Sequence, residues 1–158
     1  MKSKTTLRAV LALAGLAALA QVPARADDHG RSIVLLPSYV QECAACHAPY
    51  PPGLLPKESW QRLMDNLPRH FGTDASVDAA TQKALSTWLV SYAGTGKRAR
   101  TAPPEDRITR SDWFVREHRE VPRAAWTRPA IKSAANCGAC HEGAAQGMYD
   151  EDSVRIPR

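Results

Sequence analysis

The sequence predicts an all-α fold in which much of the chain is irregular. Apolar residues recur at helical spacing in several segments, and proline or glycine interrupts each of these segments. No segment shows the strict alternation of apolar and polar residues that is typical of a half-buried strand. Periodicity and helix breakers together therefore predict helices joined by turns, without a sheet.

The first 26 residues are typical of a cleaved export signal. Three basic residues precede an apolar stretch at residues 9–20, and an Ala-Arg-Ala cleavage pattern follows at residues 24–26. The apolar stretch is shorter than the about 20 residues that span a bilayer, and no later segment is long and apolar enough. We therefore expect an exported mature chain that starts at Asp27 and has no membrane span.

Removal of this signal changes the charge balance of the protein. The whole chain has a formal charge of +5, with 21 basic and 16 acidic residues. The signal holds four of the basic residues and none of the acidic ones, so the mature chain keeps 17 against 16, a charge of +1. A nearly neutral chain lacks the basic footprint of a nucleic-acid-binding protein. We therefore expect no nucleic-acid partner.

The first two helices of the mature chain are expected on either side of a proline-rich break. Ser38 and Gln41 have capping-box spacing, which predicts a helix that begins at Ser38. The Pro-Pro-Gly sequence at residues 51–53 ends this helix. Apolar residues within residues 60–67 then keep i, i+3, i+4, i+7 spacing until Pro68.

A third helix is expected at residues 76–92, with Gly94 as its end signal. Its buried face would carry Val77, Ala84, Leu85, Trp88, Leu89 and Tyr92. Beyond it, residues 94–104 have almost nothing to bury, and we interpret residues 97–110 as a linker. This linker would separate an N-terminal lobe, residues 27–96, from a C-terminal lobe, residues 111–158.

The C-terminal lobe has weaker helix signals. A short helix is expected around His118, where Pro122 cuts it. Ser133 is placed to cap a last helix that carries residues 137–141. This lobe is therefore predicted to be short and irregular.

Two copies of one pentapeptide, Cys-x-x-Cys-His, use all four cysteines, at residues 43–47 and 137–141. This pattern attaches c-type haem. The two sulfurs form thioethers with the porphyrin, and the following histidine becomes an axial iron ligand. The sequence therefore predicts two haem c groups, with His47 and His141 as proximal iron ligands and covalent attachment at Cys43, Cys46, Cys137 and Cys140. In bacteria this attachment takes place outside the inner membrane, which agrees with the export signal.

Other uses of the cysteines fit less well. Zinc ribbons pair their Cys-x-x-Cys knuckles at roughly 15 to 20 residues, whereas here the gap runs from Cys46 to Cys137. Structural disulfides would not require a histidine after each pair. A thioredoxin-type redox pair needs a preceding strand, and neither motif has one.

The sixth iron ligand decides what each haem can do. An open position allows small molecules to bind or react, whereas a filled one restricts the iron to electron transfer. His29, His70 and His118 remain as candidates, with Met64 and Met148 as rivals. His29 lies near the mature chain start, Met64 belongs to an apolar helical stripe and Met148 lies in the C-terminal tail. We therefore favour His70 and His118, which sit in a constrained loop and on a helix face.

The sequence resembles the small dihaem cytochromes c of proteobacteria, often called DHC. The resemblance extends over nearly all of the mature chain. It is carried by residues 42–47, 50–56, 59–67, 70–72, 113–114, 118–119, 136–141 and 156–158.

This resemblance implies a fold, a ligand set and partners. The N-terminal lobe is expected to be similar to a class I cytochrome c, and both haems are expected to have two histidine ligands. Chain proximity pairs His47 with His70 and His141 with His118, while a crossed pairing stays open. The expected partners are a small high-spin, oxygen-binding monohaem cytochrome and a donor on the quinol side of an electron-transport chain.

The expected function is a periplasmic electron-transfer relay and not an enzyme. The alternative is a periplasmic haem enzyme, of peroxidase or nitrogen-oxide reductase type, or a ligand sensor with one open iron. These alternatives require His70 or His118 to be a bystander or a ligand that leaves on reduction.

Overall fold

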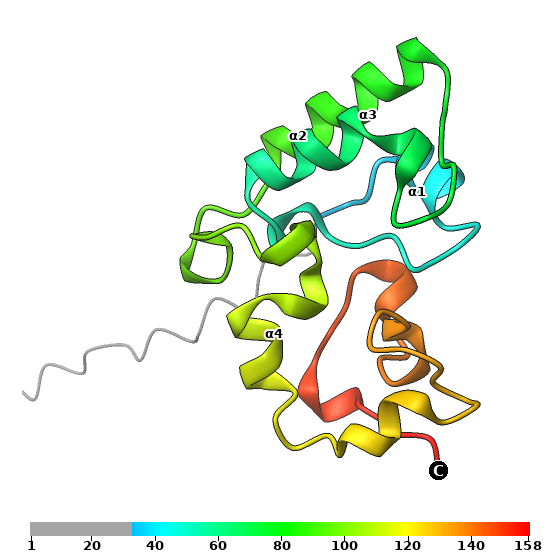
Figure 1. Ribbon diagram of the computed structural model, residues 1–158, viewed down its shortest axis with the longest axis vertical. Helices are drawn as coiled ribbons and strands as arrows, with labels where there is room; N and C mark the ends of the chain where they lie inside the picture. The colour runs from blue at the N-terminus through cyan, green and yellow to red at the C-terminus, as the bar shows by residue number, and fades with distance from the viewer. Residues whose placement is uncertain (1–32) are drawn as a thin grey trace, which may run out of the picture. The chain divides into compact units, whose positions relative to one another are not determined.

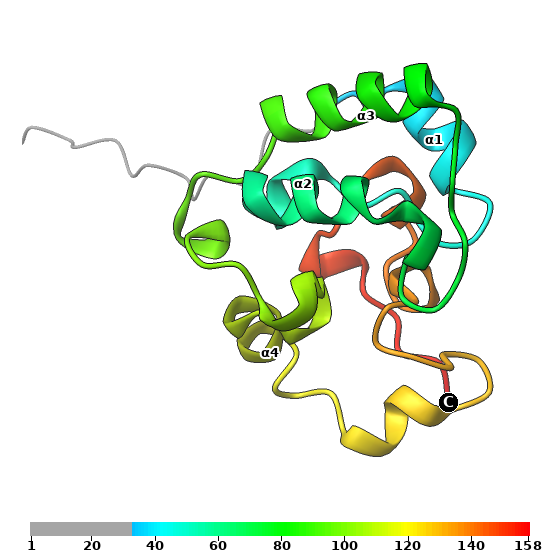
Figure 2. The same cartoon turned by 45° about the horizontal axis from the view of Figure 1, so that its top comes forward.

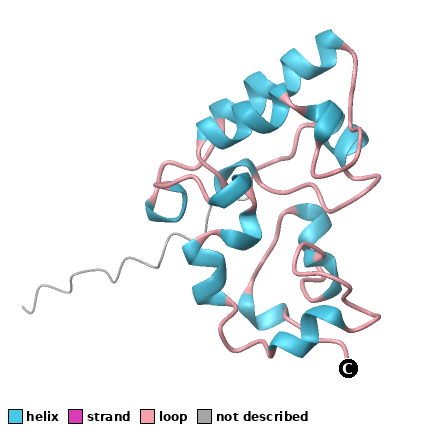
Figure 3. Cartoon of the chain, viewed as in Figure 1, coloured by secondary structure: helices cyan, strands magenta, loops and turns pink. Residues whose placement is uncertain are grey.

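The structure, a computed structural model, describes residues 33–158, and within this range helices are its only regular secondary structure (Figures 1 and 3). The described chain forms one compact unit. The all-α prediction is therefore confirmed.

The expected export signal and His29 lie outside the described residues, and none of the described helices is long and apolar enough to cross a membrane. The described residues contain four α-helices, namely α1 (Pro37–Cys43), α2 (Lys57–Asp65), α3 (Ala79–Ser91) and α4 (Asp112–Glu117).

The main core lies where α2 and α3 pack side by side, with α1 across one end (Figure 2). Their apolar faces follow the helical spacing of the sequence. Trp60 also donates a hydrogen bond from its indole Nε1 to the carbonyl of Pro52, at 2.7 Å, which ties the proline-rich turn to this core. The buried cluster is formed by Tyr39, Leu55, Trp60, Met64, Leu67, Leu85 and Leu89.

Two helix starts differ from the sequence prediction, because α1 begins at a proline without a side-chain cap and α3 is capped by another residue. α1 begins at Pro37, whose fixed backbone angle suits a first helical position, and Ser38 does not cap it. α3 begins at Ala79, because the carboxylate of Asp78 accepts hydrogen bonds from the backbone N–H groups of Ala80 and Thr81. The capping-box prediction was wrong, and the expected third helix started three residues too early.

The C-terminal half is built mainly from 3₁₀ turns. α4 is capped by Ser111, whose hydroxyl accepts a hydrogen bond from the N–H of Phe114. The expected helix after Ser133 does not form, although the Ser133 hydroxyl accepts a hydrogen bond from the N–H of Ala135, as an N-cap does. A 3₁₀ turn, Cys137–Ala139, takes its place. The buried apolar residues of this half are Phe114, Ala125, Ile131 and Ala144.

Residues 97–110, expected to be a linker with almost nothing to bury, are packed against the N-terminal helices. Ala99 is buried and Ile108 packs against the main core. Asp106 receives two hydrogen bonds from the guanidinium of Arg62 on α2, at 2.9 and 2.6 Å. The expectation of an unpacked segment was therefore wrong, while the division into two lobes stays a prediction. The segment contains the 3₁₀ turns Lys97–Ala99, Pro104–Asp106 and Ile108–Arg110.

The ion pair between Asp106 and Arg62 should stabilise the protein in a pH-dependent way. Hydrogen bonding from Arg62 holds the pKa of Asp106 below its ordinary value. The pair therefore stabilises the folded state at pH values above the ordinary carboxyl range. This stabilisation is lost as the pH falls through the lowered pKa of Asp106. We expect Asp106→Asn to lower the free energy of unfolding by roughly 1 kcal/mol at neutral pH, and by much less at about pH 3.

Urea unfolding of wild type and variant at both pH values measures this difference. Asparagine tolerates the positive φ of 55° at this position, so the substitution tests the charge and not the turn. Glu120→Gln is the matched control, since the pair of Glu120 with Arg119 is fully at the surface. A cost for Asp106→Asn that is equal at both pH values would contradict the prediction.

Candidate haem sites

The first predicted ligand pair comes together at one end of the main core. His47 lies in the turn that follows α1, and His70 follows the 3₁₀ turn Leu67–Arg69. Their ring centroids are 6.2 Å apart, and their ring planes differ by 29°. The two imidazoles thus face one another although 23 positions separate them in the chain.

The second predicted pair comes together in the C-terminal half. His118 ends α4, and His141 follows the 3₁₀ turn of the second cysteine motif. Their ring centroids are 6.1 Å apart, and their planes differ by 74°. The two sites thus share one spacing but differ in ring orientation, near parallel at the first and near perpendicular at the second.

This common spacing fits a haem iron between each pair. A metal–imidazole bond is about 2.0 Å long and the ring centre lies roughly 1.1 Å beyond the nitrogen, so two imidazoles on opposite faces of one metal have centroids about 6 Å apart. Both pairs have this separation. The structure therefore places each expected proximal histidine opposite an expected sixth ligand, in the pairing that chain proximity suggested.

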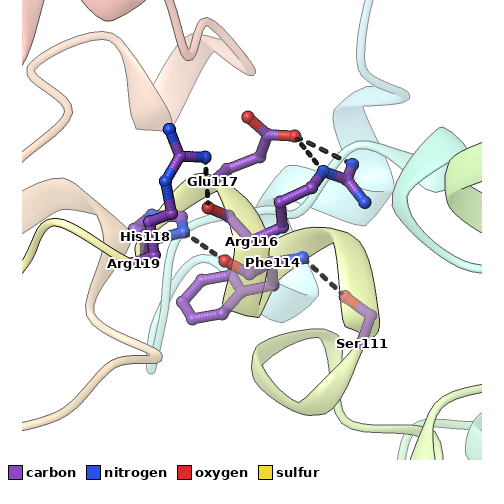
Figure 4. A network of polar contacts seen from close by, with 6 residues as sticks. All are labelled: Ser111, Phe114, Arg116, Glu117, His118 and Arg119. Carbon is purple, nitrogen blue, oxygen red and sulfur yellow. Dashed lines mark hydrogen bonds and ion pairs between the residues drawn. The ribbon is translucent and has the colours of Figure 1, made fainter.

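Two of the four imidazoles are oriented by a backbone carbonyl. The Nδ1 of His47 lies 2.7 Å from the carbonyl oxygen of Ala48, and the Nδ1 of His118 lies 2.9 Å from that of Phe114 (Figure 4). A carbonyl can only accept, so each Nδ1 carries the proton and leaves the Nε2 lone pair for a metal. The Nδ1 atoms of the other two, His70 and His141, are buried and make no hydrogen bond to another protein atom among the described residues.

A tight turn presents His70. Phe71 and Gly72 both have positive φ, 52° and 96°, and His70 pairs with Thr73 across the turn. The Arg107 guanidinium lies 4.3 Å from the centre of the Phe71 ring and so holds the turn from the other side. Burial first, then the charges of His47 and Arg107, lower the pKa of His70. These surroundings favour the neutral imidazole, which is the form that binds a metal.

Aromatic rings hold His118 in place. The Phe114 ring stacks on the His118 imidazole at 3.9 Å, and the Trp126 ring lies 5.8 Å from it. Because Phe114 and His118 are four residues apart, the helix itself brings the two rings together. His118 is half-buried in this position.

No disulfide joins any of the four cysteines. Burial raises the pKa of Cys43 and of Cys137 to about 11 in each case, which indicates apolar surroundings suited to a porphyrin edge. Cys43 is the last residue of α1, and Cys137 begins the 3₁₀ turn of the second motif. Among residues 33–158, no group of three or more His, Cys, Asp or Glu side chains is gathered as a zinc site requires.

The C-terminal segment closes the second site. Val154 forms a backbone bridge with His141, and the N–H of Arg155 donates to the carbonyl of Cys140 at 2.9 Å. Arg128 also donates to the carbonyl of Pro157 at 2.7 Å. Figure 1 shows this last segment, in red, running beside the orange segment that carries the motif.

The rival methionine ligands lie elsewhere. Met64 is buried in the main core, in the role that the apolar stripe predicted. Met148 is 45% exposed, and it lies against Gly143. Tyr50 was not among the predicted site residues, but its ring stacks on His47 at 4.7 Å with an angle of 12°. Its position three residues after the motif was the only local signal.

A model of the dihaem cytochrome c family matches residues 39–149, a range that includes both pentapeptides and all four histidines of the two pairs. The chain belongs to the dihaem cytochrome c family. The resemblance stated from the sequence is confirmed, and the protein carries two haem c groups with iron. No curated protein was found that matches this dihaem cytochrome.

Solved structures of other dihaem cytochromes c share its fold. A dihaem cytochrome c from Shewanella baltica OS155 is 35% identical, with a TM-score of 0.67, over 77% of this chain and 92% of the other. A dihaem cytochrome c from Rhodobacter sphaeroides is 39% identical, with a TM-score of 0.66, over 74% and 98%. A second structure, of DHC purified from the same organism, is 38% identical, with a TM-score of 0.61, over 74% and 100%.

Proposed function

We propose that this dihaem cytochrome is a periplasmic electron-transfer relay in which both irons are six-coordinate and low-spin. His47 and His70 bind one iron, and His141 and His118 bind the other. Thioether bonds attach the first haem at Cys43 and Cys46 and the second at Cys137 and Cys140. The export signal expected at residues 1–26 supports the location, since it precedes both attachment motifs.

The observation that carries this proposal is the spacing of the two histidine pairs. Ring centroids at 6.2 and 6.1 Å match the separation of two imidazoles that bind opposite faces of one iron, which supports this ligand set. Haem supplies one-electron chemistry when bound. The imidazoles on both sides occupy the positions that a substrate would need, which favours electron transfer over a haem enzyme or a ligand sensor.

The relay exchanges electrons with other redox proteins. On the resemblance of the sequence, the donor is a protein on the quinol side of an electron-transport chain, and the acceptor is a small high-spin monohaem cytochrome that binds oxygen. Family membership supports the carrier role, because two haem groups in one small chain offer an entry and an exit for an electron.

Electron paramagnetic resonance of the oxidised protein tests the ligation of both irons. We expect two low-spin ferric signals and no high-spin signal. The two signals should differ from one another. Near-parallel imidazole planes make two of the iron d orbitals unequal in energy, whereas near-perpendicular planes leave them almost equal. The first site, at 29°, should give an ordinary rhombic signal, and the second, at 74°, a strongly anisotropic one.

Carbon monoxide provides the second measurement. The reduced protein should form no adduct, because both irons lack an open position. A high-spin signal or a ready adduct in the wild-type protein would contradict the relay and favour the enzyme or sensor.

A further inference from the structure

Tyr50 contacts both haem sites, and two different parts of its side chain make the contacts. Its ring stacks on the imidazole of His47 at 4.7 Å, with an angle of 12° between the planes. Its hydroxyl donates a hydrogen bond of 2.7 Å to the carbonyl of Ala135, 85 positions further along the chain. Ala135 lies two residues before Cys137, where the second motif begins. One side chain thus connects the proximal ligand of one site with the attachment turn of the other.

Neighbouring contacts hold Tyr50 itself in place. The buried Tyr39 donates a hydrogen bond of 2.9 Å from its hydroxyl to the backbone carbonyl of Tyr50. A Cβ added to Gly147 would lie 3.4 Å from the Cγ of Pro51, so the C-terminal segment passes directly over the residue that follows Tyr50. In that segment, the ring of Tyr149 meets the imidazole of His141 edge-on at 5.3 Å.

The phenol of Tyr50 is suited to a permanent structural contact. Its hydroxyl donates to a backbone carbonyl, which can only accept. A rigid ring with a polar tip can pack against one partner and bond to another at the same time.

We propose that Tyr50 is a positioning residue that holds the two haem sites in a fixed relation, with its ring setting the plane of His47 and its hydroxyl holding the turn before Cys137. This inference rests on the proposed function in one respect, namely that a fixed separation of the sites governs electron exchange between the haems. The structural part, a link between the His47 ring and the turn at Cys137, does not depend on it.

The holoprotein variant Tyr50→Phe removes the hydroxyl and keeps the ring. Loss of one hydrogen bond of this kind should let the Cys137 turn open roughly fivefold more often. The amide protons of Ala139, Cys140 and His141, which are bonded within that turn, should then exchange with solvent faster by the same factor. Amide protons of α3 should exchange as in the wild type. Electron exchange between the haems after photoreduction should be slower, while both low-spin signals remain.

Tyr50→Leu removes the ring as well. It should therefore also change the g values of the haem at His47 and His70, whose imidazoles are near-parallel. The g values of the haem at His118 and His141 should stay unchanged. Tyr92→Phe is the matched control, because Tyr92 is 49% exposed and contacts Trp88 away from both histidine pairs; it should behave as the wild type does. Unchanged amide exchange in Tyr50→Phe, or an equal increase in α3, would overturn the proposal. Amide exchange does not report iron ligation, so a failure of the bis-histidine assignment would appear separately, as a high-spin signal in the wild type.

Discussion

His118→Ala is expected to convert one of the two haems to a high-spin form that binds carbon monoxide, while the other stays low-spin. The physical reason is that His118 supplies the imidazole opposite His141, at a ring separation of 6.1 Å. With that side chain truncated, this face of the iron lacks a nitrogen ligand and becomes accessible. His70→Ala should have the same effect on the other haem, opposite His47.

Electron paramagnetic resonance distinguishes the two variants and also tests the pairing. His118→Ala should remove the strongly anisotropic signal of the near-perpendicular pair, and His70→Ala should remove the rhombic signal of the near-parallel pair. Loss of the opposite signal in each case would show that the pairing is crossed. Met148→Leu is the control, since Met148 is the exposed rival ligand, and it should retain both low-spin signals. If His118→Ala or His70→Ala also retained both, the assignment of that ligand would be wrong.

Cys140→Ala is expected to impair covalent attachment of the second haem and to leave much of the C-terminal half unfolded. That half buries few apolar side chains of its own among the described residues, and two of them are alanines. A haem packed there replaces a missing core and stabilises the folded state by binding it. Without firm attachment, this part of the chain should lose its main packing partner.

Intact-protein mass spectrometry measures the haem content, and limited proteolysis measures the folding of each half. Cys43→Ala makes the same chemical change at the first site, where the buried cluster around Trp60 and Leu89 remains. We expect that variant to lose attachment but to resist proteolysis better than Cys140→Ala. Equal resistance of the two variants would contradict a C-terminal half that depends on its haem.

The sequence predicted those parts of the fold that depend on local periodicity. α2 and α3 follow from the spacing of Trp60, Met64, Leu85 and Leu89, because a helix with an apolar stripe on one face must bury it. The helix starts were less predictable, because several residues compete to cap an end. The C-terminal half was the hardest part, since its 3₁₀ turns are too short to show a period.

The candidate sites were predictable to a different degree. Each pentapeptide identified two cysteines and one histidine without any knowledge of the fold. His70 and His118 required reasoning about which histidines remained and where helices end. The contacts of Tyr50 could not be predicted, because a hydrogen bond to Ala135 spans 85 positions and arises only when distant segments pack together. The burial of Ala99 and the packing of Asp106 against α2 were missed for the same reason.

The closure of the second site by the C-terminal segment has a consequence for the order in which the protein matures. Val154 and Arg155 are held against the backbone of His141 and Cys140, and they lie 13 and 14 positions beyond His141. The second site can therefore close only after the polypeptide has emerged as far as Arg155. The proposed ligands of the first site end at His70, so that site can form while the following residues are still emerging. Haem attachment should accordingly proceed from the N-terminal motif to the C-terminal one.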